Sequence, residues 1–211
     1  FGGYLLRQGG TFLGSTNKGN PFKFPTKDGK IIDRSKEIIE GYHQMKLDGL
    51  IIIGGDGSMQ ILKRLAKEGD MKIVAIPKTI DNDLIVTDNC PGFGSVAKYV
   101  ATSAMEASLD LKSMCKTSTK VFVLEVMGRH AGWIAAAAEL ANTLCSDIYV
   151  HKILLPEVPF NEEKFLQGVE SDISKFGYSV IVASEGLKDS NGNLYSETGQ
   201  KDSFGHSQLG G

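Results

Sequence analysis

Residues 51–58 read IIIGGDGS, and residues 75–83 read AIPKTIDND. Each stretch is an apolar run that ends in glycine, aspartate, serine or threonine. A buried strand of a parallel sheet has this pattern where its carboxyl end reaches the crevice in which open α/β sheets bind ligands. We therefore expect both runs to be strands of a parallel sheet, with their polar ends at a binding site.

The rest of the chain alternates apolar runs with amphipathic stretches. Helical spacing of apolar residues begins at Ser35, and Ser58 is expected to open a second helix. Further helices are expected over residues 94–111, 132–144 and 162–175, and strands over residues 50–53, 72–76, 121–126, 153–155 and 179–183. This alternation predicts an α/β fold, a doubly wound and mostly parallel sheet with helices on both faces.

Composition excludes several classes of function. The chain has 211 residues and a formal net charge of −2, so it offers no broad basic field for nucleic acid. No apolar run approaches the roughly 20 residues of a membrane helix, and we expect no membrane partner. Cys90, Cys115 and Cys145 lie far apart without CxxC spacing, which indicates free thiols in a reducing compartment. We expect a cytoplasmic protein.

The GGDGS segment has the composition of a phosphate-binding turn. Gly54, Gly55 and Gly57 carry no side chains, so backbone N–H groups can approach a phosphate. Asp56 adds a carboxylate that could hold Mg²⁺, and a helix opened by Ser58 favours anions at its N-terminus. The alternative is a tight strand-to-helix turn in which Asp56 is merely solvated.

The PKTIDND segment places Asp81 and Asp83 on either side of Asn82. In extended backbone both carboxylates would point to one face. Two adjacent carboxylates repel and raise one pKa unless a cation lies between them. Mg²⁺ would relieve this conflict and leave one aspartate free to take a proton from an alcohol, which together with GGDGS indicates phosphoryl transfer. The alternative is a local turn in which these side chains bond their own backbone.

A third polar segment, EVMGRHAGW at residues 125–133, also follows an apolar run. Arg129 offers a bidentate fork for phosphate, and Gly128 allows a ligand to approach the backbone. Alternatively, Arg129 pairs with a carboxylate and His130 is an ordinary residue at the start of a helix. We assign His130 no catalytic role, because a lone histidine is more often structural or exposed.

Three more polar residues stand at the ends of expected strands. Lys120 precedes the strand over residues 121–126, where it could contact a phosphate or protect a sheet edge. Glu185 and His206 follow late strands and occupy plausible crevice positions. The sequence alone gives neither of them a partner.

These segments together resemble the phosphofructokinase family. The resemblance rests on GGTFLGS at residues 9–15, GGDGS, PKTIDND, PGFGSVAKYVATSAMEA from residue 91, TKVFVLEVMGRHAGW from residue 119, LPEVPF from residue 155, ASEG from residue 183 and FGHSQLGG at residues 204–211. It implies the family's fold, with residues 1–118 as the phosphoryl-donor-binding part and residues 119–211 as the start of the sugar-phosphate-binding part. The family's first glycine-rich loop and its C-terminal part have no counterpart here, so we expect a fragment lacking both ends.

The resemblance also implies roles on the donor side. Asp81 is the base that deprotonates the sugar 1-hydroxyl, Asp83 supports it, and Thr79 lines the reacting phosphoryl group. Asp56 holds the Mg²⁺ cofactor on the donor phosphates. The remaining implied donor-binding residues are Gly55, Gly57, Ser58, Lys78 and Lys18, the last being the nearest cation to a position where many members carry an arginine.

On the sugar side, the resemblance implies that Met127, Gly128 and Arg129 contact fructose 6-phosphate. Glu185 matches an acidic sugar contact. Lys120 and His206 match residues that often reach the sugar phosphate bound to a neighbouring subunit. We therefore expect a homo-oligomer, a dimer or a tetramer.

The implied reaction is Mg²⁺-dependent phosphoryl transfer to fructose 6-phosphate, giving fructose 1,6-bisphosphate in glycolysis. ATP-dependent members typically have Gly at the positions of both Gly57 and Lys78, whereas pyrophosphate-dependent members typically have Asp at the first and Lys at the second. This chain combines Gly57 with Lys78, a mixed pattern. A side chain at position 57 would crowd the α-phosphate of a nucleotide. We therefore expect ATP as the donor, with a pyrophosphate-dependent phosphotransferase as the alternative.

Two other classes of protein remain possible. NAD kinases and lipid kinases also use Gly-Gly-Asp-Gly, but PKTIDND and EVMGR argue against them. A catalytically silent subunit of the same fold is a further alternative. Such a subunit is expected to lose the base, whereas Asp81 and Asp83 are both present.

Overall fold

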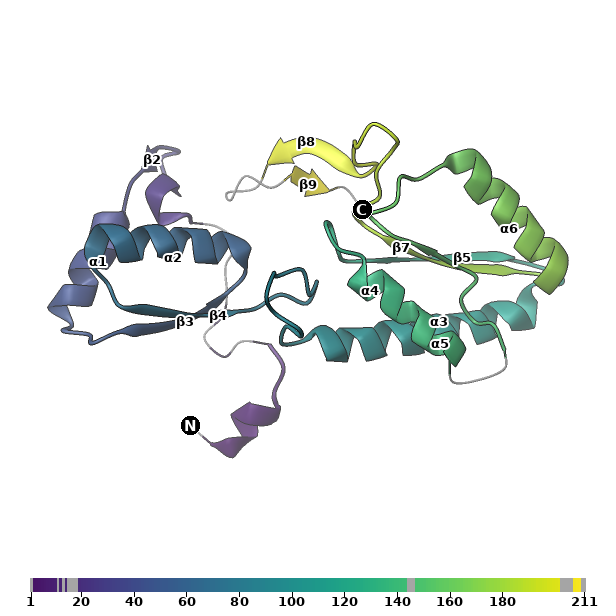
Figure 1. Cartoon of the computed structure of the whole chain (residues 1–211), viewed down its shortest axis with the longest axis horizontal. Helices are drawn as coiled ribbons and strands as arrows, with labels where there is room; N and C mark the ends of the chain where they lie inside the picture. Colours follow the sequence, from purple (N-terminus) through teal and green to yellow (C-terminus); the bar gives the residue numbers. More distant parts are fainter. Residues whose placement is uncertain are drawn as a thin grey trace. The chain divides into compact units, whose positions relative to one another are not determined.

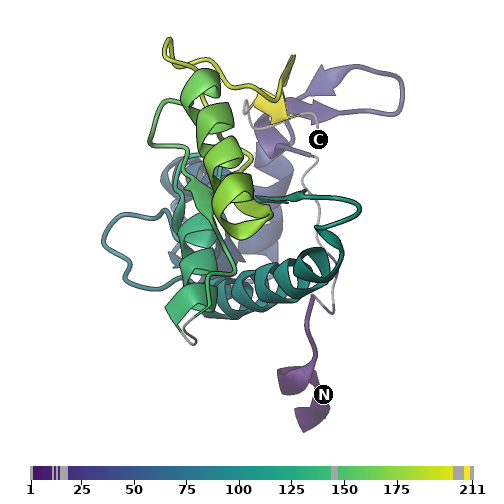
Figure 2. The ribbon, with the colours of Figure 1, turned by 90° about the vertical axis from the view of Figure 1, so that its right-hand side faces the viewer.

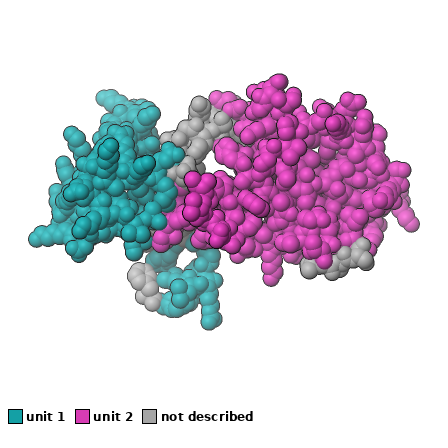
Figure 3. Space-filling view, viewed as in Figure 1, with its two compact units in different colours: residues 1–52, 56–75, 201–206 teal, residues 53–55, 76–200, 207–211 magenta. Residues whose placement is uncertain are grey.

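Figure 1 shows the computed structural model, which describes residues 2–10, 12, 14, 19–143, 147–201 and 207–209. The chain divides into two compact units, coloured separately in Figure 3. The first comprises residues 1–52, 56–75 and 201–206, and the second comprises residues 53–55, 76–200 and 207–211. The functional boundary expected after residue 118 is of a different kind and stays a prediction.

The first unit contains helices α1 (Ser35–Gln44) and α2 (Asp56–Gly69) and the greater part of two strands, β3 (Leu50–Gly54) and β4 (Ile73–Pro77). The last two residues of each strand belong to the second unit. The Leu50 N–H donates to the Lys72 carbonyl (2.9 Å), and the Lys78 N–H donates to the Gly54 carbonyl (2.8 Å). Both bonded pairs span nearly the same sequence separation, so the strands run parallel. The short elements before them are η1 (Gly3–Arg7), η2 (Pro21–Lys23) and the antiparallel pair β1 (Phe24–Pro25) and β2 (Ile31–Ile32).

Both helices of this unit cover one face of the β3–β4 pair (Figure 1). The core there consists of Tyr42, Leu65 and Met71 with partly buried neighbours such as Leu50 and Ile73. The alternate side chains of the strands are exposed, among them Ile51, Ile53, Val74 and Ile76. The expected buried strands are therefore buried on one face only, because side chains alternate along a strand and only one face carries helices in the part of the chain that is described.

The second unit contains a three-stranded parallel sheet. Its strand order is β5 (Val121–Val126), β7 (Ser179–Ser184) and β6 (Lys152–Leu154). In the register, Val121 pairs with Ser179 and Lys152 pairs with Ile181. All six residues of the central strand β7 are buried. The α/β class and the parallel pairing predicted from the sequence are confirmed.

Helices lie on both faces of this sheet (Figures 1 and 2). One face carries α3 (Phe93–Met114), α4 (Trp133–Ala136) and α5 (Leu140–Thr143), and the other carries α6 (Glu162–Phe176). The single helix expected over residues 132–144 is wrong in detail, because a 3₁₀ turn, η3 (Ala137–Glu139), separates α4 from α5. Its alanines do pack closely as expected: Ala104 of α3 and Ala138 of η3 are both fully buried.

Other boundaries differ only slightly from the predictions. Helix α2 begins at Asp56, ahead of the expected Ser58, and α3 extends to Met114. The two-stranded pair β8 (Glu197–Lys201) and β9 (Ser207–Leu209) completes the described elements. Cys90 and Cys115 are buried free thiols, as predicted, and Cys145 lies outside the described residues. No helix in the described part of the chain has both the length and the apolarity needed to cross a membrane.

Candidate active site

Except for Lys120, the described site residues predicted in the second unit lie at or after the carboxyl ends of strands. The segment over residues 78–90, which we call the catalytic segment, follows β4. The segments over residues 127–132 and 184–186, which we call the acceptor segments, follow or end β5 and β7. This is the edge at which open parallel sheets place their ligands.

Four charged residues of these segments lie within electrostatic reach of Asp81. The pKa of Asp81 is raised above its ordinary value of 3.8, first because burial disfavours its charge and then because Asp83 and Glu185 are near. Arg129 and Lys78 oppose this shift in pKa. The structure therefore brings together one partly buried carboxyl group, two further carboxylates and two cations, all of them predicted site residues.

Asp81 also has an unsatisfied polar atom. Its Oδ1 is buried and has no hydrogen-bond partner among the described residues. The Asp81 backbone N–H donates to Thr79 Oγ1 (3.2 Å), so the threonine hydroxyl is engaged by the backbone of the catalytic segment. Burying a carboxylate oxygen without a hydrogen bond costs free energy. A ligand that bonds this oxygen would offset that cost.

The backbone between Asp81 and Asp83 is not extended. Asn82 has a left-handed conformation with φ of +55°, so the strand alternation expected to point both carboxylates to one face is wrong. Its side chain bonds the backbone of the same segment: Oδ1 accepts from the Cys90 N–H (2.8 Å), and Nδ2 donates to the Asp88 carbonyl (3.3 Å). The local-turn alternative therefore holds for Asn82, while the two aspartates remain close enough to interact.

The acceptor segments are held together by a buried hydroxyl. Ser184 Oγ donates to the Gly128 carbonyl (2.5 Å) and accepts from the Gly186 N–H (3.1 Å). Gly128 has φ of +123°, and a Cβ added there would stand 2.5 Å from the Ala131 carbonyl oxygen. Sequence reasoning did not single out Ser184, because a serine that ends an apolar strand gives no indication of a partner 56 residues away.

Glycines also allow close backbone approach around Arg129. A Cβ on Gly186 would collide with the carbonyl group of Arg129. A Cβ on Gly132 would stand 2.8 Å from side-chain atoms of Glu157 and Leu155, and the Gly132 N–H donates to Glu157 Oε1 (2.8 Å). Arg129 itself is half-buried and makes no ion pair within the described part of the chain, so the alternative that it serves a structural salt bridge is not supported.

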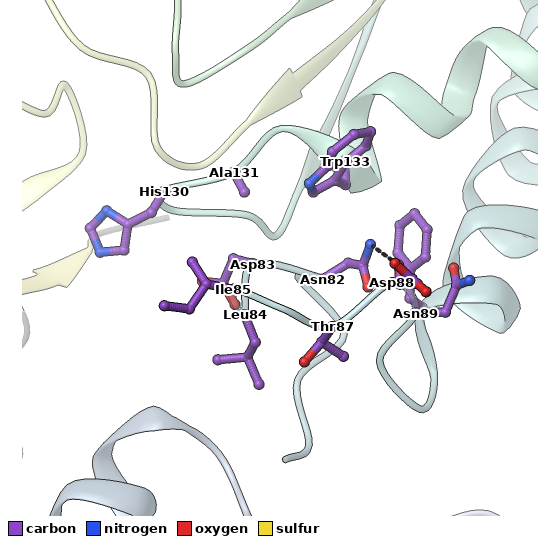
Figure 4. Close-up of a pocket in the computed structure, with 11 residues that line it drawn as sticks. Asn82, Asp83, Leu84, Ile85, Thr87, Asp88, Asn89, His130, Ala131 and Trp133 are labelled. Carbon is purple, nitrogen blue, oxygen red and sulfur yellow. Dashed lines mark hydrogen bonds between the residues drawn. The ribbon is translucent and has the colours of Figure 1, made fainter.

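A pocket of about 610 Å³ lies between the catalytic segment and the turn after β5 (Figure 4). Residues 82–85 and 87–89 line one side, and His130, Ala131 and Trp133 line the other. The half-exposed Trp133 is the chain's single tryptophan, and no pattern in the sequence selected it for the site. Asp83 is the one predicted catalytic residue among the residues that line this pocket.

Several predicted residues cannot be joined to this site. Lys18 and His206 lie outside the described residues. Asp56, Gly57 and Ser58 begin helix α2 in the first unit, whereas Gly55 belongs to the second unit, where a Cβ on it would stand 3.5 Å from the Lys78 carbonyl oxygen. Lys120 and Met127 are exposed. No group of three metal-ligating side chains occurs in the described ranges.

A parallel α/β sheet with carboxylates, cations and glycine turns at its carboxyl edge is the arrangement at which open α/β folds bind their ligands. A family model described as phosphofructokinase matches residues 3–211. The chain therefore belongs to the phosphofructokinase family.

Relatives within the family carry both kinds of donor in their names. A pyrophosphate–fructose 6-phosphate 1-phosphotransferase of Halomonas elongata is 54% identical over 75% of this chain and 38% of its own length. An ATP-dependent 6-phosphofructokinase 1 of Nostoc sp. is 43% identical over 98% of this chain and 54% of its own length. The chain thus spans about half the length, or less, of these relatives.

A solved structure supports the fold. The pyrophosphate-dependent phosphofructokinase from Nitrosospira multiformis superposes with a TM-score of 0.70 at 46% sequence identity. The match covers 76% of this chain and 42% of the solved chain. The α/β architecture of this chain is therefore that of the family.

Proposed function

We propose that this protein is a 6-phosphofructokinase that transfers a phosphoryl group to the 1-hydroxyl of fructose 6-phosphate, giving fructose 1,6-bisphosphate. The observation that carries the proposal is Asp81, a partly buried carboxyl group with a raised pKa and an unpartnered oxygen. A general base works best when its pKa lies near the working pH and when it can reach the proton that it removes. Burial and its acidic neighbours move the pKa of Asp81 above 3.8, the direction that the first requirement favours.

The cations beside Asp81 supply the charge that phosphoryl transfer needs. Lys78 and Arg129 both lie near enough to lower the pKa of Asp81 in part. In phosphoryl transfer, most of the catalysis comes from positioning and from neutralising charge on phosphate oxygens. We assign Lys78 to the donor phosphates and Arg129, with Met127 and Gly128, to the sugar phosphate. Thr79 and Asp83 flank the reacting group.

We assign Mg²⁺ to Asp56, together with the oxygens of the donor phosphates. Mg²⁺ is usually held by one or two carboxylates plus substrate phosphates rather than by a full protein cage. The assignment to Asp56 rests on the resemblance of the GGDGS segment to the family's donor-binding motif. When bound, Mg²⁺ neutralises negative charge on the phosphates.

ATP is the proposed donor, and pyrophosphate is the alternative. Gly57 leaves room beside the α-phosphate of a nucleotide, which favours ATP. Lys78 is compatible with either donor, and relatives named for each donor match the chain. The proposal of ATP as the donor therefore rests on the absence of a side chain at Gly57.

The assembly and location of the protein follow from the same proposal. Lys120 and His206 are assigned to the sugar phosphate of a neighbouring subunit, so the active enzyme is a homo-oligomer. We also propose a cytoplasmic location, where fructose 6-phosphate and the donor are available. Lys120 is exposed at the start of β5, as a residue that reaches a neighbouring subunit must be.

The experiment is an assay of fructose 1,6-bisphosphate formation by the whole protein with Mg²⁺, supplying ATP and pyrophosphate separately. We expect turnover with ATP. The variant Gly57→Asp should lose ATP turnover selectively because its side chain would crowd the α-phosphate, whereas the exposed control Lys36→Ala should match the wild type. Turnover with pyrophosphate alone would reject the donor assignment and leave the acceptor assignment intact.

If neither donor supports turnover while fructose 6-phosphate still binds, the protein is a catalytically silent subunit. Calorimetry with fructose 6-phosphate alone separates this case from a misassigned acceptor. Absence of both binding and turnover in correctly folded protein would overturn the proposed function.

A further inference from the structure

Asn82 lies between the two carboxylates of the catalytic segment and turns the backbone there. Its φ of +55° is left-handed, a conformation that asparagine adopts more readily than most other residues with side chains. The turn at Asn82 therefore sets the directions in which Asp81 and Asp83 leave the backbone.

The Asn82 side chain uses both ends of its amide within the catalytic segment. Oδ1 accepts the Cys90 N–H at 2.8 Å, and Nδ2 donates to the Asp88 carbonyl at 3.3 Å, the bond drawn in Figure 4. Exchanging the amide oxygen and nitrogen would place a donor against the Cys90 N–H, so the two bonds fix the orientation of the amide. The side chain closes the segment into a ring across residues 82–90.

The far side of this ring is anchored in the core. Cys90 is only 3% exposed, and its carbonyl accepts from the Phe93 N–H (3.1 Å) at the start of α3. Ile80 packs against the same junction, since a Cβ on Gly92 would stand 3.1 Å from Ile80 Cγ2. Asp81 is thus held from both sides, by Ile80 in the core and by the Asn82 amide on Cys90.

The tip of the ring has no such anchor. Ile85 and Val86 are fully or almost fully exposed, at 91% and 104% of their reference areas. Val86 also has φ of +60°, which is unfavourable for a β-branched residue. Since burial does not hold the tip, the shape of the segment depends on the hydrogen bonds at its base.

We propose that Asn82 is a positioning residue, which holds Asp81 and Asp83 in their reactive directions by fixing the left-handed turn and by tying it to Cys90 and Asp88. Both ends of its amide are engaged within the catalytic segment, and the proposal rests on the proposed function for its catalytic readout. Loss of the Asn82 side chain should lower kcat without a matching change in KM. The reason is that Asn82 is proposed to orient the reacting carboxylates and not to bind the substrate.

The test compares Asn82→Ala and Asn82→Gly with the wild type in the whole protein. Alanine removes the amide and disfavours the left-handed backbone, whereas glycine removes the amide and keeps that backbone available. A misplacement of about 1 Å at a reacting group can cost on the order of 100-fold in rate. We expect Asn82→Ala to lose about that factor in kcat, with KM for fructose 6-phosphate changed less than about threefold.

Asn82→Gly should lose less activity than Asn82→Ala, which is the rescue expected if the left-handed turn matters by itself. Asn191→Ala is the matched control, since Asn191 is exposed in another turn and its side chain makes no hydrogen bond among the described residues. Values of kcat within about threefold of the wild type in both Asn82 variants would overturn the proposal. So would loss of folding in both variants, because Asn82 would then serve the fold.

Trp133 gives a readout that does not depend on the reaction. It faces the Asn82 side of the pocket (Figure 4), so its fluorescence and its quenching by acrylamide report the catalytic segment. The Trp133 contribution is obtained by difference from Trp133→Phe in each background. If the wild type does not phosphorylate fructose 6-phosphate, the proposed function fails, and this signal alone decides the role of Asn82. Altered quenching in Asn82→Gly supports that role, and unchanged quenching overturns it.

Discussion

The catalytic segment and the acceptor segments occupy equivalent places at the ends of parallel strands, yet they are held differently. In the acceptor segments, backbone packs closely against backbone, and neither Gly128 nor Gly186 has space for a Cβ. Ser184 Oγ forms hydrogen bonds to both glycines. In the catalytic segment one side chain, that of Asn82, closes a loop whose tip is exposed.

This difference separates two physical requirements. A group that binds a constant part of the substrate gains from rigid, well-satisfied surroundings. A general base instead needs a carboxylate whose pKa is raised because its surroundings disfavour the charged form. Such an unfavourable environment persists only where the surrounding structure maintains it. The buried Oδ1 of Asp81, without a partner in the described structure, is the mark of the second requirement.

The largest expected effect comes from Asp81→Asn. It should lower kcat by about 10²- to 10⁴-fold, the usual contribution of a general base. It should also raise the thermal midpoint at pH 7. The folded-state pKa of Asp81 lies above the ordinary 3.8, so the wild type loses stability as the pH rises through that raised value, whereas the amide variant does not.

Thermal unfolding of both proteins at pH 7 and near pH 4 checks this sign. The advantage of the variant should shrink as the pH falls toward 3.8, where the wild-type carboxyl group becomes protonated in both states. An Asp81→Asn protein that is less stable than the wild type at pH 7 would show that the buried carboxylate stabilises the fold, and it would rule out a carboxyl group whose charged form is disfavoured.

Gly186→Ala should give the next largest effect, on the acceptor side. Its Cβ would collide with the Arg129 carbonyl group, and neither backbone can move without disturbing Ser184. We expect destabilisation of about 1–3 kcal/mol or more, measured by urea unfolding. Gly94→Ala is the control, since a Cβ there meets no described atom within 4 Å and lies in helix α3, where alanine is favoured. Equal stability of the two variants would refute tight packing at Gly186.

Ser184→Ala should destabilise the fold by about 1–3 kcal/mol, because it leaves the Gly128 carbonyl and the Gly186 N–H buried without their partner. The control is Ser113→Ala, which removes an exposed hydroxyl that also donates to a carbonyl. Its free energy of unfolding should stay within about 0.5 kcal/mol of the wild-type value. Denaturant midpoints measure both. If Ser184→Ala loses no more free energy of unfolding than Ser113→Ala, water replaces the Ser184 hydroxyl and the expectation is wrong.

The smallest effect concerns His151, which lies at the other end of β7. Its Nδ1 accepts the Val180 N–H (3.1 Å), and burial lowers its pKa below 6.5 despite the nearby Asp172. Because the folded-state pKa is below the unfolded value, stability is present above about pH 6.5 and falls as the pH drops through that value toward the folded-state pKa.

Unfolding midpoints of the wild type and His151→Phe between pH 7.5 and 5 test this dependence. We expect the acid-induced loss to be smaller in the variant, with KM for fructose 6-phosphate unchanged, since the acceptor segments lie at the carboxyl end of the strand. An identical pH dependence in the two proteins would contradict the assignment.

The sequence was sufficient to predict the elements whose causes are local. Strand β5 and helix α6 fall almost where apolar runs and helical spacing placed them, and the charged site residues follow strands as predicted. The exposure of Ile51 and Ile53 was not predicted, because an apolar run does not reveal whether one or both faces of a strand are covered.

The bracing of the site could not be predicted for a similar reason. Asn82 was expected in extended backbone, but its left-handed turn depends on hydrogen bonds to Asp88 and Cys90 that no local pattern specifies. Ser184 and Trp133 enter the site through contacts between segments that are distant in the sequence. Motifs therefore pointed to the proposed reacting groups, while the residues that hold them emerged only from the fold.

The measurement that tests the central claim most directly is the pH dependence of kcat/KM for fructose 6-phosphate in the wild type and in Asp81→Asn. If Asp81 is the base, the wild-type profile falls on its acid side with an apparent pKa above 3.8, and the residual rate of Asp81→Asn lacks that fall. An acid limb that persists unchanged in Asp81→Asn, or activity that survives the substitution, would contradict the assignment of Asp81 as the base.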